Sequence, residues 1–550
     1  MILKSFKIWN FKSIEYSNEI NLKKLIVNIG PNNSGKSNLN QAIILMKQTF
    51  ENHDPILPLT LNGPLINLGE FKDLIFQHDL ERDFKIEFIF ESELCYVCMI
   101  CGDLFSRRGL IKSHILNYHS NLEDFDDYIK YKESNGEKEL FSLRFSYFYD
   151  QKNEIIKIKE ILFQSKGYKE KAESLVFIFK QESIFTKIST SKGNFNAEGY
   201  IKESQEHQAP DHRKIFSQFE ALNYVFQKEV KISKIRKNRG KEVLDLYNPK
   251  NSSESFQFKI EINDFEKFVE DYDRENYPSL YSFYVNIRET MLETYHYLRD
   301  ILISSRYIGP LRDTPSRIFF SSGGNPKSVG LAGEQTYEIL WKDSQSNKEL
   351  ERDLNYWLMK MGFNSNLRVQ KLGSSNVYQI FMEENGTMFN IRDVGFGISQ
   401  ILPILVECLI LSKYSSQYQL INYEKGRRNF YLVNRRLLII EEPEIHLNPK
   451  IQTILGDFFI YTSNEYTPFI IETHSVNILN RIQRRIIEKK FDFSDVVINF
   501  FEKKNNRTII TQIYLNEIGN YSFWPKNFFQ DDYTETIKMI KGTFKENSEE

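Results

Sequence analysis

The sequence is short of cysteine, of net charge and of long apolar runs. It has four cysteines among 550 residues, too few for a disulfide framework, and three of them lie together at positions 95, 98 and 101. Its 72 basic and 74 acidic residues nearly cancel, so no global electric field attracts nucleic acid and any such surface has to be local. No run approaches a membrane span, and the first four residues lack the apolar core of a signal peptide. We therefore expect a cytoplasmic protein with no membrane contact.

A glycine-rich motif, G-x-x-x-x-G-K-S, follows the apolar run at residues 25–29 and precedes a helix-like stretch at residues 38–50. In a strand–loop–helix context this motif wraps backbone N–H groups around a β-phosphate, at the positive end of the following helix. The residues expected to bind a nucleoside triphosphate are Gly30, Asn32, Asn33, Ser34, Gly35, Lys36 and Ser37. Lys36 would reach the β- and γ-phosphates, and the Ser37 hydroxyl would ligate Mg²⁺.

Two further apolar runs end in acidic or histidine-containing motifs. Residues 437–440 lead into Glu441 and Glu442, and residues 468–471 lead into a segment that contains His474. At the carboxyl end of a strand, Glu441 can hold the magnesium shell while Glu442 polarises the attacking water as general base. His474 is placed to sense the γ-phosphate. The alternatives are a solvated acidic turn and an ordinary loop histidine.

A fourth motif, residues 393–400, opens the apolar helix expected at residues 401–411. Small residues at a helix N-terminus make a second phosphate-facing site, for which we expect Gly397, Ser399 and Gln400 to supply the contacts. The chain already has its own phosphate loop. This second site is therefore expected to complete the nucleotide site of another protomer, with two ATP molecules sandwiched in a head-to-tail pair.

The order of these four motifs resembles the ABC-type ATPase heads of the SMC and OLD-like group, in which they are the Walker A, signature, Walker B and switch-histidine elements. Residues 10–13, 307–312 and 440–449 are especially similar to OLD-type bacterial ATPases. The resemblance covers about residues 1–90 and 300–535. It implies an α/β fold, an ABC/SMC-type P-loop ATPase head assembled from both chain ends, with ATP and Mg²⁺ as ligands and a homodimer formed through the heads.

Many relatives in this group are components of bacterial anti-phage defence systems. The resemblance therefore implies a sensor or regulator that acts with a separately encoded effector protein. An OLD-type nuclease would need a metal-binding Toprim domain, and only about 75 residues follow His474. A DNA-repair or chromosome-organising SMC-like ATPase is a further alternative. The sequence has no heptad pattern that persists for several repeats, so we expect no long coiled-coil arm, and this argues against the alternative.

The clustered cysteines belong to a pattern with the spacing of a two-Cys, two-His zinc finger. The expected Zn²⁺ ligands are Cys98, Cys101, His114 and His119. Two thiolates on a hairpin and two imidazoles little more than a helical turn apart can close a tetrahedron around zinc. A unit of about thirty residues buries too little to fold alone, so the metal has to hold it. Phe105 and Ile111 would fill its small core.

Three roles for this finger are open: contact with DNA or RNA, docking of a protein, and stapling of the fold. In the docking geometry that zinc fingers adopt on DNA, the residues facing the bases would be Arg107, Leu110 and Ser113. A leucine side chain cannot hydrogen-bond to a base. A basic cluster follows at residues 228–241. It is either a solvated face or a contact with a phosphate backbone.

The motifs divide the chain into five expected parts. Residues 1–92 form the N-terminal half of the ATPase head, 93–122 the zinc finger, 123–300 an insertion, 301–515 the C-terminal half of the head and 516–550 a small C-terminal extension. Within the insertion, residues 139–190 alternate apolar and charged side chains as strands do, and residues 213–300 are expected to be mostly helical. The insertion as a whole is therefore expected to be mainly helical.

Overall fold

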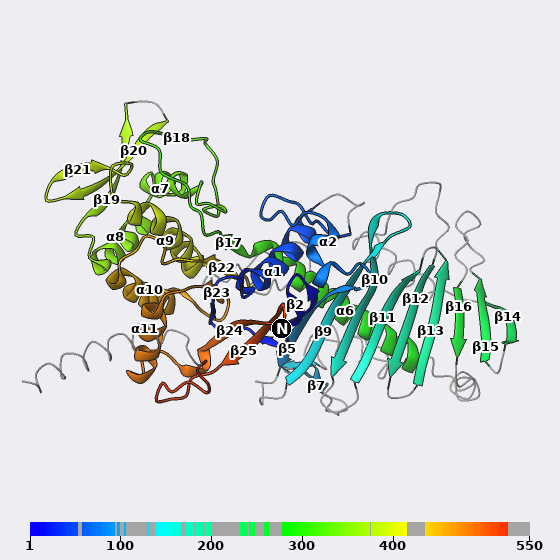
Figure 1. The fold of residues 1–550 in the computed structure, drawn as a ribbon. Helices are drawn as coiled ribbons and strands as arrows, with labels where there is room; N and C mark the ends of the chain where they lie inside the picture. Colours follow the sequence, from blue (N-terminus) through cyan, green and yellow to red (C-terminus); the bar gives the residue numbers. More distant parts are fainter. Residues whose placement is uncertain are drawn as a thin grey trace, which may run out of the picture. The chain divides into compact units, whose positions relative to one another are not determined.

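The computed structural model describes residues 1–52, 58–93, 96–98, 104–105, 129–131, 138–166, 172–180, 183–190, 193–200, 231–238, 241–247, 258–262, 278–373, 376–414 and 435–525. The chain divides into two compact units (Figure 1). One unit comprises Met1–Ile20 and Leu45–Ile303, and the other comprises Asn21–Ile44 and Ser304–Glu550. Both units therefore combine segments that lie far apart in the sequence.

The first unit is built on a twelve-stranded sheet. The strand order is β14-β15-β16-β13-β12-β11-β10-β9-β5-β1-β2, with β3 paired to β1. Its first strands are β1 (Ile2–Phe11), β2 (Ile14–Tyr16), β3 (Ile20–Asn21), β5 (Phe84–Glu93), β9 (Lys138–Asp150) and β10 (Ile155–Lys166). Alternate residues in the middle of β9 are buried, as in a strand with one face against a core. Two short helical turns, α2 (Phe71–Leu74) and η1 (Phe76–His78), precede β5.

The insertion continues this sheet instead of forming a helical module. The expected strands within residues 139–190 are confirmed. The remaining elements are β11 (Ala172–Lys180), β12 (Ser183–Thr190), β13 (Gly193–Tyr200), β14 (Lys231–Asn238), β15 (Lys241–Tyr247), β16 (Phe258–Ile262) and the helix α6 (Pro278–Ser304). The expected helical character of residues 213–300 is thus wrong for β14, β15 and β16 and right for α6. These residues form strands because they pair with other strands of the sheet, as β16 does with β13 and β15. Such pairing cannot be predicted from the local sequence pattern.

A small separate sheet lies in the region expected to be a zinc finger. Its strands are β6 (Tyr96–Cys98), β7 (Leu104–Phe105) and β8 (Ile129–Tyr131), in the order β7-β6-β8. β6 and β7 pair in antiparallel fashion, so the connection between them carries Cys101. Cys101, His114 and His119 lie outside the described residues, and so do the expected reading positions Arg107, Leu110 and Ser113.

The second unit is built on a six-stranded sheet in the order β17-β22-β23-β4-β24-β25. The strands are β17 (Arg306–Ile308), β22 (Leu438–Glu441), β23 (Phe469–Glu472), β4 (Leu25–Ile29), β24 (Val496–Lys504) and β25 (Arg507–Ile513). All neighbours are parallel except β24 and β25. Every residue of β4, β22 and β23 is buried, as expected for central strands of a parallel sheet. Their carboxyl ends meet at one edge, where ligands bind in such sheets.

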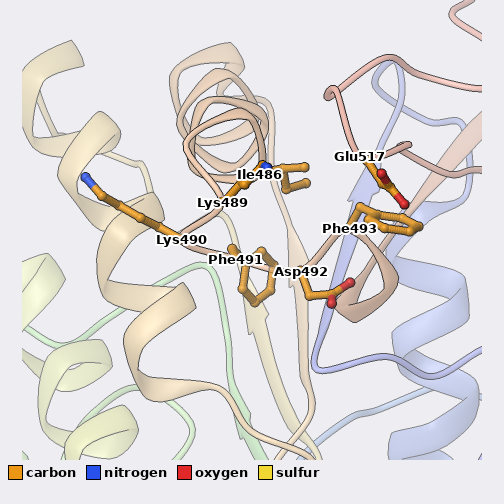
Figure 2. Close-up of a pocket in the computed structure, with 7 residues that line it drawn as sticks. All are labelled: Ile486, Lys489, Lys490, Phe491, Asp492, Phe493 and Glu517. Atoms are coloured by element: carbon orange, nitrogen blue, oxygen red, sulfur yellow. The ribbon is translucent and has the colours of Figure 1, made fainter.

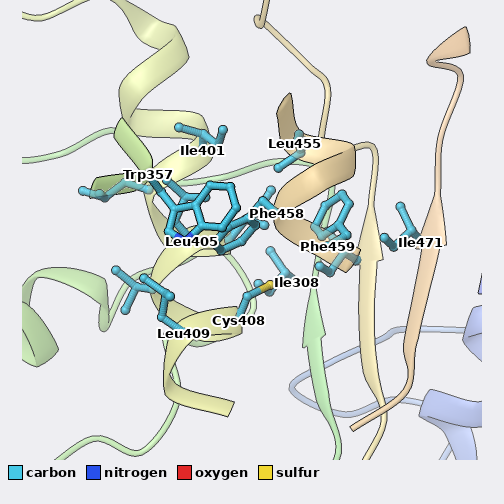
Figure 3. Packing of buried hydrophobic residues seen from close by; sticks show 14 of the residues in the cluster. Ile308, Trp357, Ile401, Leu405, Cys408, Leu409, Leu455, Phe458, Phe459 and Ile471 are labelled. Atoms are coloured by element: carbon cyan, nitrogen blue, oxygen red, sulfur yellow. The ribbon is translucent and has the colours of Figure 1, made fainter. Parts of the chain in front are cut away.

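Helices and a small second sheet complete this unit. The helices are α1 (Lys36–Glu51), α7 (Thr336–Ser344), α8 (Glu349–Met361), α9 (Phe396–Tyr414), α10 (Pro449–Thr462), α11 (Val476–Ile487) and the turn η3 (Phe493–Asp495). The small sheet consists of β18 (Phe319–Phe320), β19 (Asn366–Leu372), β20 (Val377–Glu384) and β21 (Thr387–Asn390). Trp357 of α8, Leu405 of α9 and Phe458 of α10 belong to one buried cluster that includes Ile471 of the six-stranded sheet (Figure 3).

Helix α9 is an apolar helix of this core. By length and composition its segment Phe396–Lys413 could cross a membrane, which corrects the expectation that no run approaches a span. However, 72% of that segment is buried inside the fold, where it packs against α8 and α10. A buried core helix passes the same test as a membrane span.

Candidate functional site

The phosphate loop joins the carboxyl end of β4 to the first turn of α1. Gly30 has a φ of +152°, and a side chain there would collide with the carbonyl oxygen of Phe501 on the neighbouring strand. Asn33 and Gly35 also have positive φ, 58° and 98°, which turns the loop back over the helix N-terminus. The motif therefore adopts the tight strand–loop–helix path that presents backbone N–H groups to an anion.

Lys36 is folded back onto this loop. Its ammonium donates to the carbonyl oxygens of Gly30 and Pro31, both at 3.0 Å, and the residue is only 4% exposed. Burial lowers the pKa of Lys36, against the opposing pull of Glu472. Ser34 is also buried, and its hydroxyl has no hydrogen-bond partner among the residues that the structure describes. A buried cation and an orphaned hydroxyl around a Gly-rich loop fit a phosphate ligand.

Ser37 lies beside two carboxylates at the edge of the sheet. Its hydroxyl donates to Glu472 Oε1 at 2.9 Å. The Asn40 amide donates to Glu441 Oε1 at 3.1 Å and to Glu472 Oε2 at 3.0 Å. Glu441 and Glu472 are register partners at the ends of the parallel strands β22 and β23. Because the hydroxyl proton is held by Glu472, the oxygen lone pairs of Ser37 are left for a cation.

Glu472 was overlooked as a site residue by the sequence analysis, which assigned the magnesium shell to Glu441 alone. The available signal was its position directly after an apolar strand, in the same place that Glu441 occupies after its own strand. Burial, followed by the negative charge of Glu441, raises the pKa of Glu472 to about 8. Burial also raises the pKa of Glu441, against hydrogen bonds from Asn40 and Tyr307. Two crowded carboxylates of this kind are stabilised by a bound cation.

Glu442 and His474 approach the same point from neighbouring loops. Glu442 has a strained backbone, with a φ of 47°, and its N–H donates to the carbonyl of Glu472 at 2.8 Å. The pKa of His474 is lowered by burial and by the positive charge of Lys36, while Glu442 raises it. Glu444 accepts a hydrogen bond from the His474 backbone N–H, which ties the two loops together. Glu442 and His474 thus lie close enough to Lys36 of the phosphate loop for their charges to interact with it, and their catalytic roles stay predictions.

Arg312 is a second residue to which sequence reasoning gave no role. Its guanidinium donates to the carbonyl of Glu441 at 2.6 Å and to that of Glu442, and burial lowers its pKa to about 10. Gln400 donates to the Arg312 carbonyl at 3.3 Å. Arg312 therefore connects the acidic motif to the first turn of α9.

The other expected contacts of the signature motif are placed as follows. Ser399 and Gln400 are buried, and the Ser399 hydroxyl donates to the carbonyl of Phe396 at 2.8 Å. A side chain at Gly397 would come within 3.1 Å of the His446 carbonyl, so the helix lies directly against the loop after β22. Phe396 at the helix start is 63% exposed. The helix N-terminus itself, and not the two polar side chains, is the part that faces outward.

The donor set fits a magnesium ion that is shared with a phosphate. Within the described residues, no group of three or more histidine, cysteine, aspartate or glutamate side chains is arranged to hold a metal. Mg²⁺ is usually bound by one or two protein oxygens, with phosphate and water oxygens completing the octahedron. The residues that would hold it are Ser37, Glu441 and Glu472.

The same unit has a surface cavity that does not include any residue of this site. An open cavity of about 400 Å³ lies beyond the C-terminal end of α11, and Figure 2 shows its lining. The lining residues are Ile486, Lys489, Lys490, Phe491, Asp492, Phe493 and Glu517. None of them belongs to the phosphate loop or to the acidic motifs.

A phosphate loop on a central parallel strand, with carboxylates at the ends of the adjacent strands, defines a P-loop ATPase. The expected α/β head assembled from both chain ends is confirmed, since β4 comes from one end and β22, β23 and β24 from the other. Residues 1–479 match the family described as the AAA ATPase domain, and the chain belongs to this family. The protein is therefore an ATP-hydrolysing enzyme.

Other comparisons give more distant similarities. The comparison with curated proteins found no significant match. The SMC head domain from Thermotoga maritima is 10% identical, with a TM-score of 0.33, and the match covers 94% of this chain and 100% of that one. The Smc head domain with an extended coiled coil bound to the C-terminal domain of ScpA, from Pyrococcus furiosus, is 9% identical, with a TM-score of 0.34 and coverages of 98% and 99%. TM-scores this low carry no functional inference.

Proposed function

We propose that this ATPase hydrolyses Mg²⁺-bound ATP at the site formed by the phosphate loop, Glu441, Glu442, Glu472 and His474. The observation that carries the proposal is the hydrogen bond from Ser37 to Glu472 beside the paired carboxylate Glu441. It places the hydroxyl and the acidic residues that a magnesium ion needs next to the lysine of the phosphate loop. When bound, Mg²⁺ neutralises charge on the phosphate oxygens.

In this proposal, Lys36 binds the phosphates and Glu442 accepts the proton. On nucleotide binding, Lys36 exchanges its two loop carbonyls for phosphate oxygens, because the anion is a stronger partner for an ammonium. Glu442 accepts the proton of the attacking water as general base. His474, whose lowered pKa keeps its ring neutral, hydrogen-bonds the γ-phosphate region and orients the water.

The proposal includes a homodimer through the ATPase heads, with each α9 N-terminus facing the partner's nucleotide. Large apolar side chains near that helix start support it, because they are exposed in the single chain. Leu311 is 83% exposed and Phe396 63%. Water-exposed apolar groups next to a functional helix terminus are typical of a surface that another protein covers.

At the level of the cell, we propose a sensor or regulator in a bacterial anti-phage defence system, acting with a separately encoded effector. Support comes from the resemblance of residues 10–13, 307–312 and 440–449 to OLD-type ATPases. The second candidate is a DNA-repair or chromosome-organising ATPase. The longest helix among the described residues of the insertion is α6 of 27 residues, which favours the first candidate.

We also propose that residues 93–122 carry a zinc site formed by Cys98, Cys101, His114 and His119. The antiparallel pairing of β6 with β7 supports it, because this hairpin places the first cysteine at the end of one strand and the second in the connection. The basic cluster of the insertion includes β14 and the start of β15. It supports DNA or RNA as a partner, with protein docking and simple stapling as the other roles.

The test of the catalytic proposal is Glu442→Gln. The amide keeps the size of the side chain and cannot accept a proton, so ATP binding should persist while turnover falls at least about a hundredfold. Binding is measured with a fluorescent ATP analogue and turnover by phosphate release. Wild-type turnover by the variant would remove Glu442 from the mechanism.

A further inference from the structure

A row of polar residues crosses the six-stranded sheet beneath the phosphate loop. Backbone register aligns Glu441 with Glu472, Glu472 with Asn28, Asn28 with Asn499, and Asn499 with Gln512. Strands in register place aligned residues on the same face, so one polar side chain from each of five neighbouring strands forms a continuous line. Asn28 and Asn499 are completely buried, and their strand neighbours at residues 25–29 and 496–501 are apolar.

These side chains form an unbroken series of hydrogen bonds that all run in one direction. Asn21 at the edge donates to Gln512 at 2.9 Å, and Gln512 donates to Asn499 at 3.0 Å. Asn499 then donates to Asn28 at 2.9 Å, and Asn28 donates to Asn40 at 3.3 Å. Asn40, on α1, donates to both carboxylates of the pair Glu441 and Glu472. We call these five amides, Asn21, Gln512, Asn499, Asn28 and Asn40, the amide chain.

The direction of the amide chain follows from its end. In the ionised form that a bound cation favours, Glu441 and Glu472 only accept hydrogen bonds, so the NH₂ group of Asn40 has to face them. The carbonyl oxygen of Asn40 then faces Asn28, which can donate to it only through its own NH₂ group. In the same way Asn499 has to donate to the carbonyl oxygen of Asn28, and Gln512 to that of Asn499. Hydrogen bonds in series polarise one another, so the whole row stabilises the orientation of Asn40.

Buried amides are costly in a sheet unless they are paired, and this row is fully paired. What the row achieves is the close approach of two carboxylates that repel each other. A single amide group bridges them, and Glu472 in turn holds the Ser37 hydroxyl. The amide chain therefore determines the geometry of all three side chains proposed to hold Mg²⁺.

We propose that Asn40 is a positioning residue for the metal-binding pair, and that Asn499 acts on the pair from the next layer by holding Asn28 and Asn40 in the required orientation. The inference rests on the proposed magnesium site. It assigns a role in metal affinity to Asn499, whose side-chain amide donates to Asn28 and accepts from Gln512. Phosphate binding by Lys36 and the loop backbone is independent of the row.

The test compares Asn40→Leu, Asn499→Leu and Asn499→Asp with the wild type. Aspartate keeps the size and polarity of Asn499 and accepts from Gln512, but it cannot donate to Asn28. Affinity for a fluorescent ATP analogue is measured with Mg²⁺ and with EDTA. All three variants should bind the metal-free nucleotide as the wild type does, and should lose about tenfold or more of the gain in affinity that Mg²⁺ provides. The double variant Asn40→Leu/Asn499→Leu should lose no more than Asn40→Leu alone.

Gln48→Leu is the matched control. Gln48 is a buried amide on the same helix α1, and it donates to the backbone carbonyls of Thr60 and Ile66 instead of to carboxylates. It should lower the melting temperature and leave the Mg²⁺-dependent gain unchanged. If the Asn499 variants also kept the Mg²⁺-dependent gain in affinity, this inference would be overturned while the proposed magnesium site would stand. A wild type that gains no affinity from Mg²⁺ would overturn the proposed magnesium site and the inference with it.

Discussion

At the scale of single residues, Lys36 shows how the site is prepared for its ligand. Its ammonium is held by the Gly30 and Pro31 carbonyls inside the loop, although burial disfavours its charge. A cation kept in place by neutral carbonyls is ready to bind an anion at little cost in side-chain ordering. Its bonds to the two carbonyls stabilise the shape of the loop, and we propose that the same ammonium binds phosphate.

Lys36→Ala should weaken ATP binding by at least about tenfold, because a hydrogen bond to a charged phosphate oxygen is lost from a buried position. Isothermal titration with ATP measures the effect. Lys47→Ala is the control, since Lys47 is a buried lysine on the same helix that pairs with Glu51 at 2.6 Å. The control should lower stability while its ATP affinity stays at the wild-type level. Equal ATP affinity for Lys36→Ala and the wild type would place the nucleotide elsewhere.

The residues of the phosphate loop could be predicted from sequence because they are contiguous, and a local motif contains its own geometry. The pairing of Ser37 with Glu472 could not, since it depends on β23 lying between β22 and β4. The same holds for Asn28 and Asn499. Each has apolar neighbours on both sides along its strand, and only the register of the assembled sheet aligns the two residues.

At the scale of elements, α9 combines an apolar core helix with one buried acid. Glu407 is 0% exposed, and it accepts from the Val329 backbone at 2.6 Å. Arg306 of β17 and Arg436, two residues before β22, stabilise its charge. Burial is the larger effect, so the pKa of Glu407 is raised.

This shift predicts a pH dependence of stability. The folded protein keeps the Glu407 proton at pH values where the unfolded chain, with an ordinary pKa near 4.5, has lost it. The stabilisation is therefore complete below about pH 4.5 and is lost as the pH rises through the folded-state pKa. Glu407→Gln removes this dependence. Its melting temperature should fall less between pH 5 and pH 8 than that of the wild type, as measured by scanning calorimetry. Parallel curves for the two proteins would contradict the shift.

The insertion is the element whose structure departs most from expectation. Its lysine-rich segment was read as helical, yet β14 and β15 pair with each other and β16 joins them to β13. Strand pairing over dozens of residues is a tertiary effect that overrides local helix propensity. The strands of β9 and β10 were predictable because their alternation is itself local.

The hairpin of β6 and β7 gives the prediction for zinc. The purified protein should contain one zinc per chain, and Cys101→Ser should lose it, as measured by elemental analysis. Arg107→Ala combined with Arg108→Ala should keep the metal. If the finger contacts nucleic acid, this double variant should bind it more weakly and with a shallower salt dependence, because fewer counterions are released. Retention of full binding by the double variant would favour protein docking, and a metal-free wild type would remove the finger.

At the scale of the whole molecule, one ATPase head draws its phosphate loop from the first forty residues and its acidic strands from the last hundred or so. Both halves have to be present for the site to exist, because Ser37 and Asn40 lie on one side of the insertion and Glu441 and Glu472 on the other. The central claim is that this composite edge of the sheet is the place where Mg²⁺ and ATP bind.

The most direct test is a structure of Glu442→Gln with Mg²⁺ and ATP. The account predicts the triphosphate on residues 30–37, and Mg²⁺ about 2.0–2.1 Å from the Ser37 hydroxyl, with Glu441 and Glu472 around it. It also predicts the start of α9 from a second chain next to the γ-phosphate. A nucleotide bound at another surface, or a metal that leaves Ser37 and both carboxylates without contact, would contradict the account.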